Sequence, residues 1–359
     1  MNRRSASRIF LRRSLAVAAC SGIATIGSHS SAATPPSNGT NINLSEKVSS
    51  CIRSISREQS KAVVRIRCSD SHGEINGTGF YVDPSGLICT LGEMIRGADH
   101  VSVQQEGDWH PATVVALDPR SGVAFLKSQA TNTPSGAASF LNPSSITNAP
   151  AQTPVIGIGF PRDAAPATSL GMITGTGTHV GEYFFCVPHL LAGIPLAEGE
   201  GGAPVVDLSG GLVGMVISGD RQTGSCWILP AAAIQKLHHD LLCRGRLNPG
   251  WIGAVVEEAA VPQGNSRARV ASVQQGSPAE VAGILPGDMI LSIAGHPVTN
   301  PEEVPGASFY LTGGEKVELK FIRKGELKKI NVTCGEPVET IGNLGSTSTT
   351  PLDPGMATR

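Results

Sequence analysis

The chain has 359 residues, of which 43 are glycine and 25 proline, and only 4% are aromatic and 16% charged. At roughly 100–200 residues per domain, this length predicts about two domains. Frequent turn residues between short apolar runs favour a β-rich protein over a helical bundle. The net charge of −1 and the lack of a basic stripe with interleaved aromatics argue against a nucleic-acid partner.

The N-terminus has the pattern of an export signal. Five arginines precede a short apolar stretch over 14–27, and small residues follow at 30–33. We predict a leader over 1–33 that is too short to span a bilayer stably. Arg12-Arg13 also permits a twin-arginine signal, and Cys20 would anchor the chain to a membrane if it were lipidated. A bacterial periplasm or envelope is favoured; a transit peptide to an organelle such as the mitochondrion is the alternative, because no acidic residue precedes Glu46.

The first folded domain is expected over 46–246, after a Pro/Ser/Asn-rich linker at 34–45. Apolar residues at helical spacing predict a short helix over 48–55, and a second helix over 231–242 ends the domain. Short strand-like runs with turn residues between them predict a barrel or a sandwich. These runs lie at 62–67, 79–82, 87–90, 101–104, 112–117, 123–126, 155–158, 184–187, 205–206, 212–217 and 227–229.

A smaller domain is expected over 247–338, and a Gly/Ser/Thr/Pro-rich tail over 339–359 is expected to be disordered. Within that domain, Ser277 is a good helix cap, Pro278 a good first helical residue, and Glu280 is placed to reach back to the cap. Gly283 is expected to end this helix. Alternating residues over 317–332 predict a hairpin.

The cysteines are scattered, with no CxxC and no neighbouring histidine at ligand spacing, which argues against a metal site. We find no motif for a nucleotide or organic cofactor either. A disulfide is compatible with an oxidising compartment, but the sequence does not select the pair. The cysteines outside the leader are Cys51, Cys68, Cys89, Cys186, Cys226, Cys243 and Cys334.

Three segments with distinctive motifs follow one another along the chain. They are GTGFYVDPSGLICT at 77–90 continuing to RGAD at 96–99, ALDPRSGVAFLK at 116–127, and GEGGAPVVD at 199–207 followed by GGLVGM at 210–215. In this order they resemble the HtrA/Deg family of trypsin-like serine proteases. The resemblance implies a trypsin-like double β-barrel followed by a small α+β PDZ domain. Relatives assemble as trimers, so a homo-oligomer or a mixed oligomer with an active homologue is expected.

The resemblance also implies that all three positions of the catalytic triad are substituted. The histidine position falls on Glu93, the aspartate position on Gly122 and the serine position on Gly201. Acyl transfer needs a nucleophile, a base and a group that orients the base, and Gly201 has no side chain. The sequence therefore predicts a pseudoprotease, with the amides of Gly199 and Gly201 as remnants of an oxyanion hole. Glu198 and Glu200, two residues apart on this loop, are expected to be solvated.

The motifs of the smaller domain are better preserved. GWIGA at 250–254 and GSPAEVAGILPGDMILSI at 276–293 resemble the PDZ domains of the same family. The resemblance implies that Trp251, Ile252, Gly253 and Ala254 form the peptide-binding loop, whose amides would hold a peptide C-terminus. Trp251 and Ile252 could instead only fill the core. Pro305-Gly306 is expected to interrupt the groove-lining helix.

These patterns predict a proteolytically inactive protein of protein quality control outside the cytoplasm. It would bind protein C-termini or unfolded polypeptides through its PDZ domain, as a chaperone-like protein or as a regulatory partner of active proteases. The alternative is an active serine endopeptidase that uses an unrecognised site, because the fold alone does not determine the activity.

Overall fold

The computed structural model describes residues 39–129, 139–144, 149–162, 164–180, 183–220 and 222–336. The predicted leader and tail lie outside these residues. The first element is helix α1 (Gly39–Gln59), which is longer than the helix predicted over 48–55 and begins inside the predicted linker. Its half-buried Ile52 and Ile55 pack against the main hydrophobic core. No helix in the described residues is long and apolar enough to cross a membrane.

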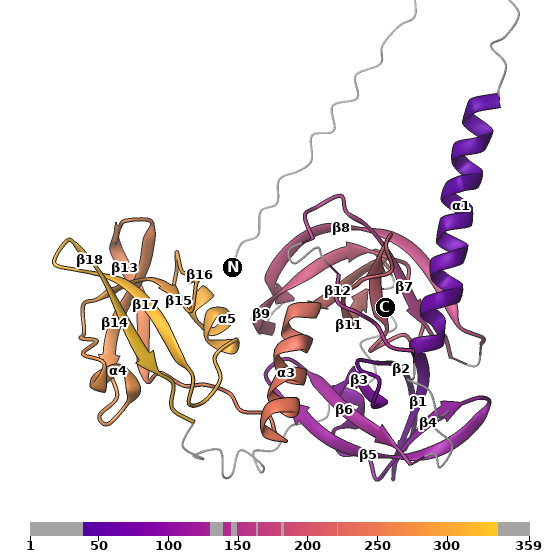
Figure 1. Ribbon diagram of the computed structural model, residues 1–359, viewed down its shortest axis with the longest axis horizontal. Helices are drawn as coiled ribbons and strands as arrows, with labels where there is room; N and C mark the ends of the chain where they lie inside the picture. The colour runs from indigo at the N-terminus through magenta and orange to yellow at the C-terminus, as the bar shows by residue number, and fades with distance from the viewer. Residues whose placement is uncertain are drawn as a thin grey trace, which may run out of the picture. The chain divides into compact units, whose positions relative to one another are not determined.

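Two closed β-barrels follow α1, and Figure 1 shows each as a ring of strands. The first has the strand order β1-β2-β3-β6-β5-β4 and the second β10-β11-β12-β9-β8-β7. The first barrel contains β1 (Val63–Asp70), β2 (Gly73–Tyr81), β3 (Leu87–Leu91), the short helix α2 (Gly92–Ile95), β4 (His100–Gln105), β5 (Asp108–Asp118) and β6 (Val123–Ser128). The second contains β7 (Pro154–Gly159), β8 (Ala167–Val180), β9 (Tyr183–Gly193), β10 (Pro204–Asp207), β11 (Leu212–Asp220) and β12 (Ser225–Pro230), and helix α3 (Ala231–Arg244) follows it.

The main core joins the two barrels, since Phe80 and Phe125 of the first lie in one cluster with Ile156 and Leu229 of the second. Leu237 brings α3 into the same cluster and is fully buried. Burying large apolar side chains contributes about 1.5–3 kcal/mol each. The mostly-β double barrel expected from the sequence is therefore confirmed.

The C-terminal domain is a small sheet with the order β13-β14-β15-β17-β18, with β16 paired to β15. Ser277 caps its short helix as predicted and accepts a hydrogen bond from the Glu280 amide at 3.2 Å. The Glu280 carboxylate reaches the Gly276 amide at 2.6 Å, one residue before the cap. The elements are β13 (Ala254–Gln263), β14 (Ser266–Val273), α4 (Pro278–Val281), β15 (Met289–Ile293), β16 (His296–Pro297), α5 (Glu303–Phe309), β17 (Lys316–Arg323) and β18 (Glu326–Thr333).

Helix α5 differs from its prediction. It runs through Pro305 and Gly306 instead of being interrupted by them. Pro305 is the third helical residue, where the backbone N–H has no intrahelical partner, so the proline removes no hydrogen bond. The helix has only 7 residues, which confirms that it is short.

Candidate functional site

The loop between β9 and β10 contains three glycines with different backbone requirements. Gly199 has φ of +95°, and a Cβ there would lie 2.7 Å from the Phe160 oxygen. Gly202 has φ of +83°, and a Cβ there would lie 2.3 Å from the Thr78 oxygen. Both positions therefore require glycine. Gly201 has no positive φ, and a Cβ there would meet no backbone atom but would lie 3.3 Å from Cδ2 of Leu91. Neither φ nor the backbone therefore requires glycine at 201, although a side chain there would need Leu91 to shift by a few tenths of an ångström.

Positions 93 and 122, which the resemblance aligns with the histidine and aspartate of the triad, lie beside this loop. Glu93 is exposed on α2, directly after β3. The Gly92 amide donates to the Gly122 oxygen at 2.7 Å, and Leu91, the residue before, is the neighbour of Gly201. Gly122 has φ of +70°, a conformation that L-residues adopt at a cost. The chain therefore brings the three positions together around the start of α2, but their side chains supply one exposed carboxylate and no nucleophile.

Thr78 donates hydrogen bonds to two carbonyl oxygens of the 199–202 loop. The fully buried Thr78 hydroxyl donates to the Gly199 oxygen at 2.9 Å, and the Thr78 amide donates to the Gly201 oxygen at 2.9 Å. Within the described residues, the amides of Gly199 and Gly201 donate no hydrogen bond. Two free amides on one tight loop can hold an anion.

A pocket of about 220 Å³ adjoins Gly201. Of its carboxylates, Glu198 is exposed as expected and pairs with Arg162 at 2.9 Å, whereas the expectation of a solvated Glu200 is wrong. Glu200 is buried and accepts a hydrogen bond from the Ala197 amide at 2.5 Å. Burial raises the pKa of Glu200 above its ordinary value, and this hydrogen bond opposes the rise. A Cβ at Gly159 would come within 2.8 Å of the Glu200 side chain, so this glycine makes the room for it.

No alternative Ser–His pair is found in the described part of the chain. The Thr90 hydroxyl donates to the Thr78 oxygen at 2.8 Å, and the Ser121 hydroxyl to Asp118 at 2.8 Å. His189 is buried and contacts the Val187 oxygen at 2.7 Å. Burial lowers the pKa of His189 to about 4, against a smaller rise from that contact.

Ser85, Asp83 and His238 come nearest to a triad, but in the wrong order. The Ser85 hydroxyl donates to one oxygen of Asp83 at 2.6 Å, and Nε2 of His238 lies 2.8 Å from the other. Burial alone would raise the pKa of Asp83, but hydrogen bonds from Ser85 and His238 lower it below its ordinary value. A nucleophilic serine must give its proton to the imidazole, and here it donates to the carboxylate. This cluster therefore ties α3 to the first barrel.

The smaller domain contains an aliphatic cavity of about 40 Å³. The loop before β13 forms one wall and α5 the other, and the sheet closes the base. Ile252 is therefore part of the wall and also packs against the core of this domain. The cavity is lined by Ile252, Ala254, Val256, Ile284, Ile290, Ile293, Val304, Ser308 and Leu319.

The loop before β13 is likewise anchored through its own carbonyl oxygens, which accept hydrogen bonds. The Ile252 oxygen accepts from the Ala279 amide at 2.9 Å, and the Gly253 oxygen from the Gln274 amide at 2.9 Å. The amides of Ile252 and Gly253 donate to no group in the described residues. Gly253 has φ of +85°, and a Cβ there would lie 2.3 Å from that of Ser277, so glycine is required. Trp251 is joined to Gly335 by two backbone hydrogen bonds of 2.8 Å.

The seven cysteines in the described residues are all free, two of them exposed. The open prediction of a disulfide therefore finds no bridge among them. No group of three or more His, Cys, Asp or Glu side chains in the described ranges is arranged to hold a metal ion.

Comparisons with known families match both domains. The sequence matches the trypsin-like peptidase domain family over residues 77–215 and the PDZ domain family over 269–323. It is 27% identical over 271 residues to the probable periplasmic serine endoprotease DegP-like of Pseudomonas fluorescens, covering 72% of this chain and 56% of that protein. It is 25% identical over 282 residues to the protein of the same name from Hahella chejuensis, covering 75% of this chain and 59% of that protein. The chain thus spans little more than half the length of these relatives.

Solved structures show the same fold. The HtrA-type protease AlgW with tripeptide aligns with a TM-score of 0.64 at 20% identity, covering 81% of this chain and 98% of that one. A serine endoprotease from Yersinia pestis aligns with a TM-score of 0.57 at 23% identity, covering 79% of this chain and 97% of that one. Similarity at this level supports the architecture, and the chemistry must be judged from the residues of this chain.

Proposed function

We propose that this chain, whose sequence matches the trypsin-like peptidase and PDZ domain families and resembles DegP-like endoproteases, is a pseudoprotease that binds polypeptides without cleaving them. The proposal rests on Gly201, which the GEGGAP motif aligns with the family's nucleophile and which has neither a positive φ nor a backbone clash that would require glycine. Glycine has no side chain to act as a nucleophile, so the covalent step of acyl transfer cannot take place at this position.

The surroundings of Gly201 support the proposal. Glu93 would replace the base with a carboxylate, and Gly122 supplies no group to orient it. The nearby hydroxyls of Thr78 and Thr90 are buried and donate to backbone oxygens. A nucleophile must be free to lose its proton to a base in contact with it, and neither hydroxyl meets this requirement.

We propose that the PDZ domain captures the free C-terminus of a polypeptide. The unpartnered amides of Ile252 and Gly253 suit a carboxylate, and the peptide would add as a strand along the edge strand β13. A cavity of about 40 Å³ lined by aliphatic groups suits a small side chain such as alanine or valine at the last position. Aromatic side chains would be excluded by size.

We place this activity in a bacterial periplasm or envelope, because the N-terminus has the pattern of an export signal and relatives are named periplasmic endoproteases. Unfolded polypeptides would be the ligands, and a homo-oligomer or a mixed oligomer with an active homologue would be the assembly. Lipidation of Cys20 would add a membrane anchor.

The test is digestion of fluorescently labelled unfolded casein by the purified protein and by Gly201→Ser. We expect no cleavage above the buffer blank by either, because Gly201→Ser restores a hydroxyl but neither its base nor the group that orients the base. An unfolding midpoint of Gly201→Ser close to that of the parent would show that the variant folds. Cleavage by the parent that persists through repurification would overturn the proposal and favour an active endopeptidase.

A further inference from the structure

The edge strand β13 is negatively charged just beyond the cavity of the PDZ domain. It is the first strand of the sheet and, among the described strands, pairs with β14 alone, so its other side is open. Ala254 and Val256 line the cavity, and the next two residues are Glu257 and Glu258, both exposed. Neither carboxylate has a role in the peptide binding proposed above.

The register of β13 with β14 shows to which face of the sheet each carboxylate belongs. Glu258 lies opposite the fully buried Ala268 and, like Val256, on the face that carries the cavity. Glu257 lies opposite the exposed Arg269, on the other face. Since successive side chains of a strand alternate between its faces, a strand added beside β13 would meet a carboxylate on both faces.

Both carboxylates have arginine partners, but these arginines belong to β14, on the side away from the open edge. Glu257 pairs with Arg269 at 2.6 Å, and Glu258 lies 3.8 Å from Arg267. A strand added at the edge would lie about 5 Å from β13 and about 10 Å from β14. Since exposed charges are largely screened beyond about 8 Å at physiological salt, the carboxylates determine which charge the edge attracts.

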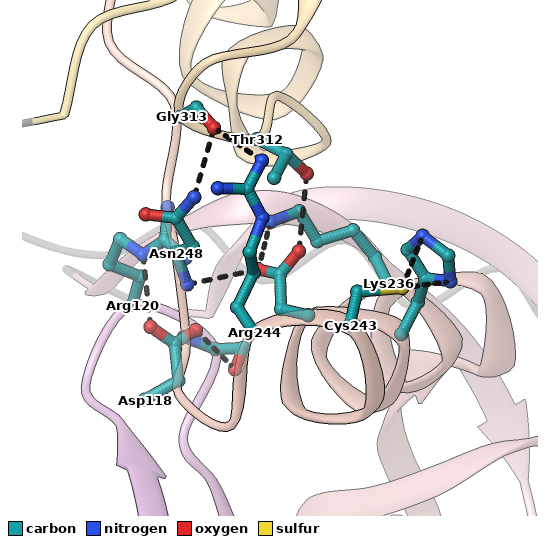
Figure 2. A network of polar contacts seen from close by, with 11 residues as sticks. Asp118, Arg120, Lys236, Cys243, Arg244, Asn248, Thr312 and Gly313 are labelled. Carbon is teal, nitrogen blue, oxygen red and sulfur yellow. Dashed lines mark hydrogen bonds and ion pairs between the residues drawn. The ribbon is translucent and has the colours of Figure 1, made fainter.

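The opposite wall of the groove, α5, adds no cation. Its one charged residue is Glu303, whose carboxylate accepts a hydrogen bond from the Thr299 amide at 2.6 Å. The loop after α5 is fixed to the end of α3 and the segment that follows it. The Asn248 side chain donates to the Gly313 oxygen at 2.9 Å, and the Arg244 guanidinium lies 3.4 Å from the same oxygen (Figure 2). A wall fixed in this way favours a single register of an added strand along β13.

A peptide whose carboxylate binds the amides of Ile252 and Gly253 and that extends along β13 runs antiparallel to it, because those amides lie just before the strand begins. Its last residue then lies opposite Ala254, its fourth-last opposite Glu257 and its fifth-last opposite Glu258. Opposite charges directly across two strands attract, and like charges repel. Given the proposed capture of a C-terminus, on which this selectivity rests, we infer that the groove selects polypeptides with lysine or arginine at the fourth- and fifth-last positions.

The test is fluorescence anisotropy of the full chain with three labelled peptides that end in valine. They differ only at the fourth- and fifth-last positions, which are both lysine, both glutamine or both glutamate. We expect the lysine peptide to bind at least about threefold more tightly than the glutamine peptide, because one cross-strand charge pair is worth up to about fivefold. The glutamate peptide should bind most weakly. Raising the salt to about 0.5 M should reduce these differences by screening.

Single lysine substitutions in the glutamine peptide assign each carboxylate. Lysine at the fourth-last position should lose its advantage in Glu257→Gln and keep it in Glu258→Gln, and the reverse should hold for lysine at the fifth-last position. Glu326→Gln is the matched control, because Glu326 is an exposed carboxylate paired with a lysine on β18, at the other edge of the sheet. This variant should retain both preferences.

Equal affinities of the three peptides at low salt would overturn the selectivity, and so would a preference for lysine that survives in the double variant Glu257→Gln/Glu258→Gln. The proposed capture of a C-terminus would stand in both cases, provided that amidation of the peptide abolishes binding. Failure of all three peptides to bind, or binding that survives amidation, would overturn the capture itself and the selectivity with it.

Discussion

At the scale of single residues, the three glycines of the 199–202 loop have different meanings. Gly199 and Gly202 are needed because neighbouring backbone leaves no space for a Cβ and φ is positive. Gly201 is under neither restriction. A sequence pattern of repeated glycines would suggest a single structural reason for all of them, but the structure shows a steric requirement for glycine at 199 and 202 and none at 201.

The buried Glu200 shows what the sequence could not reveal. Two carboxylates that lie two residues apart on a loop are expected to be solvated, and Glu198 is indeed exposed. Glu200 is buried because Gly159, on a strand 41 positions earlier in the chain, has no side chain in its place. Such a compensation between distant positions has no local signature, whereas the order and spacing of the motifs are enough to predict that positions 93, 122 and 201 correspond to the triad.

His189 should make stability depend on pH. Its folded pKa of about 4 lies below its ordinary value of 6.5, so the unfolded chain binds the extra proton between these values and the folded chain does not. The free energy of unfolding contributed by this group is therefore complete above pH 6.5 and falls as the pH is lowered to about 4. At about 1.4 kcal/mol per unit, the loss is about 3 kcal/mol.

Urea unfolding between pH 4 and 7 measures this dependence in the parent and in His189→Asn, whose amide can still donate toward the Val187 oxygen. We expect a smaller loss of stability on acidification in the variant. The matched change at an exposed site, His100→Asn, should keep the parental dependence. Identical pH profiles for the parent and His189→Asn would contradict the assignment.

At the scale of elements, hydrophobic pattern and turn residues located most strands of both barrels. All eleven runs predicted as strands overlap β1–β7 and β9–β12, and the predicted helix over 231–242 lies within α3. Strand β8 was missed because Gly171, Gly175 and Gly177 break its apolar pattern. These residues are in a strand because β7 and β9 pair with it on both sides, and such tertiary pairing overrides weak strand propensity.

The cavity between the Ile252 loop and α5 gives a prediction for peptide binding. Val304→Phe should fill the space of about 40 Å³ and weaken the binding of a peptide ending in a small aliphatic residue by at least about tenfold, a loss of about 1.4 kcal/mol. Val281→Phe is the matched control, because Val281 lies on α4 and is 83% exposed. Fluorescence anisotropy with a labelled peptide measures both, and amidation of its C-terminus should abolish binding.

Equal affinities of the parent and Val304→Phe would show that peptides do not use this cavity. Binding that survives amidation would exclude a role for the free amides of Ile252 and Gly253. The two experiments test separately the cavity for the last side chain and the loop amides for the carboxylate, which the sequence motif predicts together.

At the scale of the whole molecule, Asp240 joins α3 to the segment that follows it and to the PDZ domain. One of its oxygens accepts a hydrogen bond from the Thr312 hydroxyl at 3.1 Å. The other pairs with Lys236 and accepts from the Asn248 amide at 3.2 Å. The Asn248 side chain donates to the Gly313 oxygen at 2.9 Å. These contacts link residues far apart in sequence, and no local motif could have predicted them.

Replacing Asp240 by alanine should destabilise the protein strongly. The Lys236 side chain is only 8% exposed, and leaving such a charge without its partner costs about 3 kcal/mol. We expect a lower urea midpoint and faster proteolysis at 247–250. Glu58→Ala removes the partner of Lys61 in an exposed pair and should change stability by less than about 1 kcal/mol. Equal effects of the two variants would contradict a structural role for Asp240.

The contact between α5 and β9 has a consequence for how the PDZ domain should be delimited. A Cβ on Gly306 would lie 3.1 Å from the Cys186 oxygen, Phe309 belongs to the core cluster of the barrels, and the Arg120 guanidinium covers the Phe309 ring at 4.8 Å. The helix that forms one wall of the peptide cavity is thus supported from behind by residues encoded more than a hundred positions earlier. A fragment that begins at residue 247 would contain every residue that lines the cavity. Helix α5 would nevertheless lose the barrel residues that support it from behind. The cooperative unit of folding is therefore larger than the domain defined by sequence.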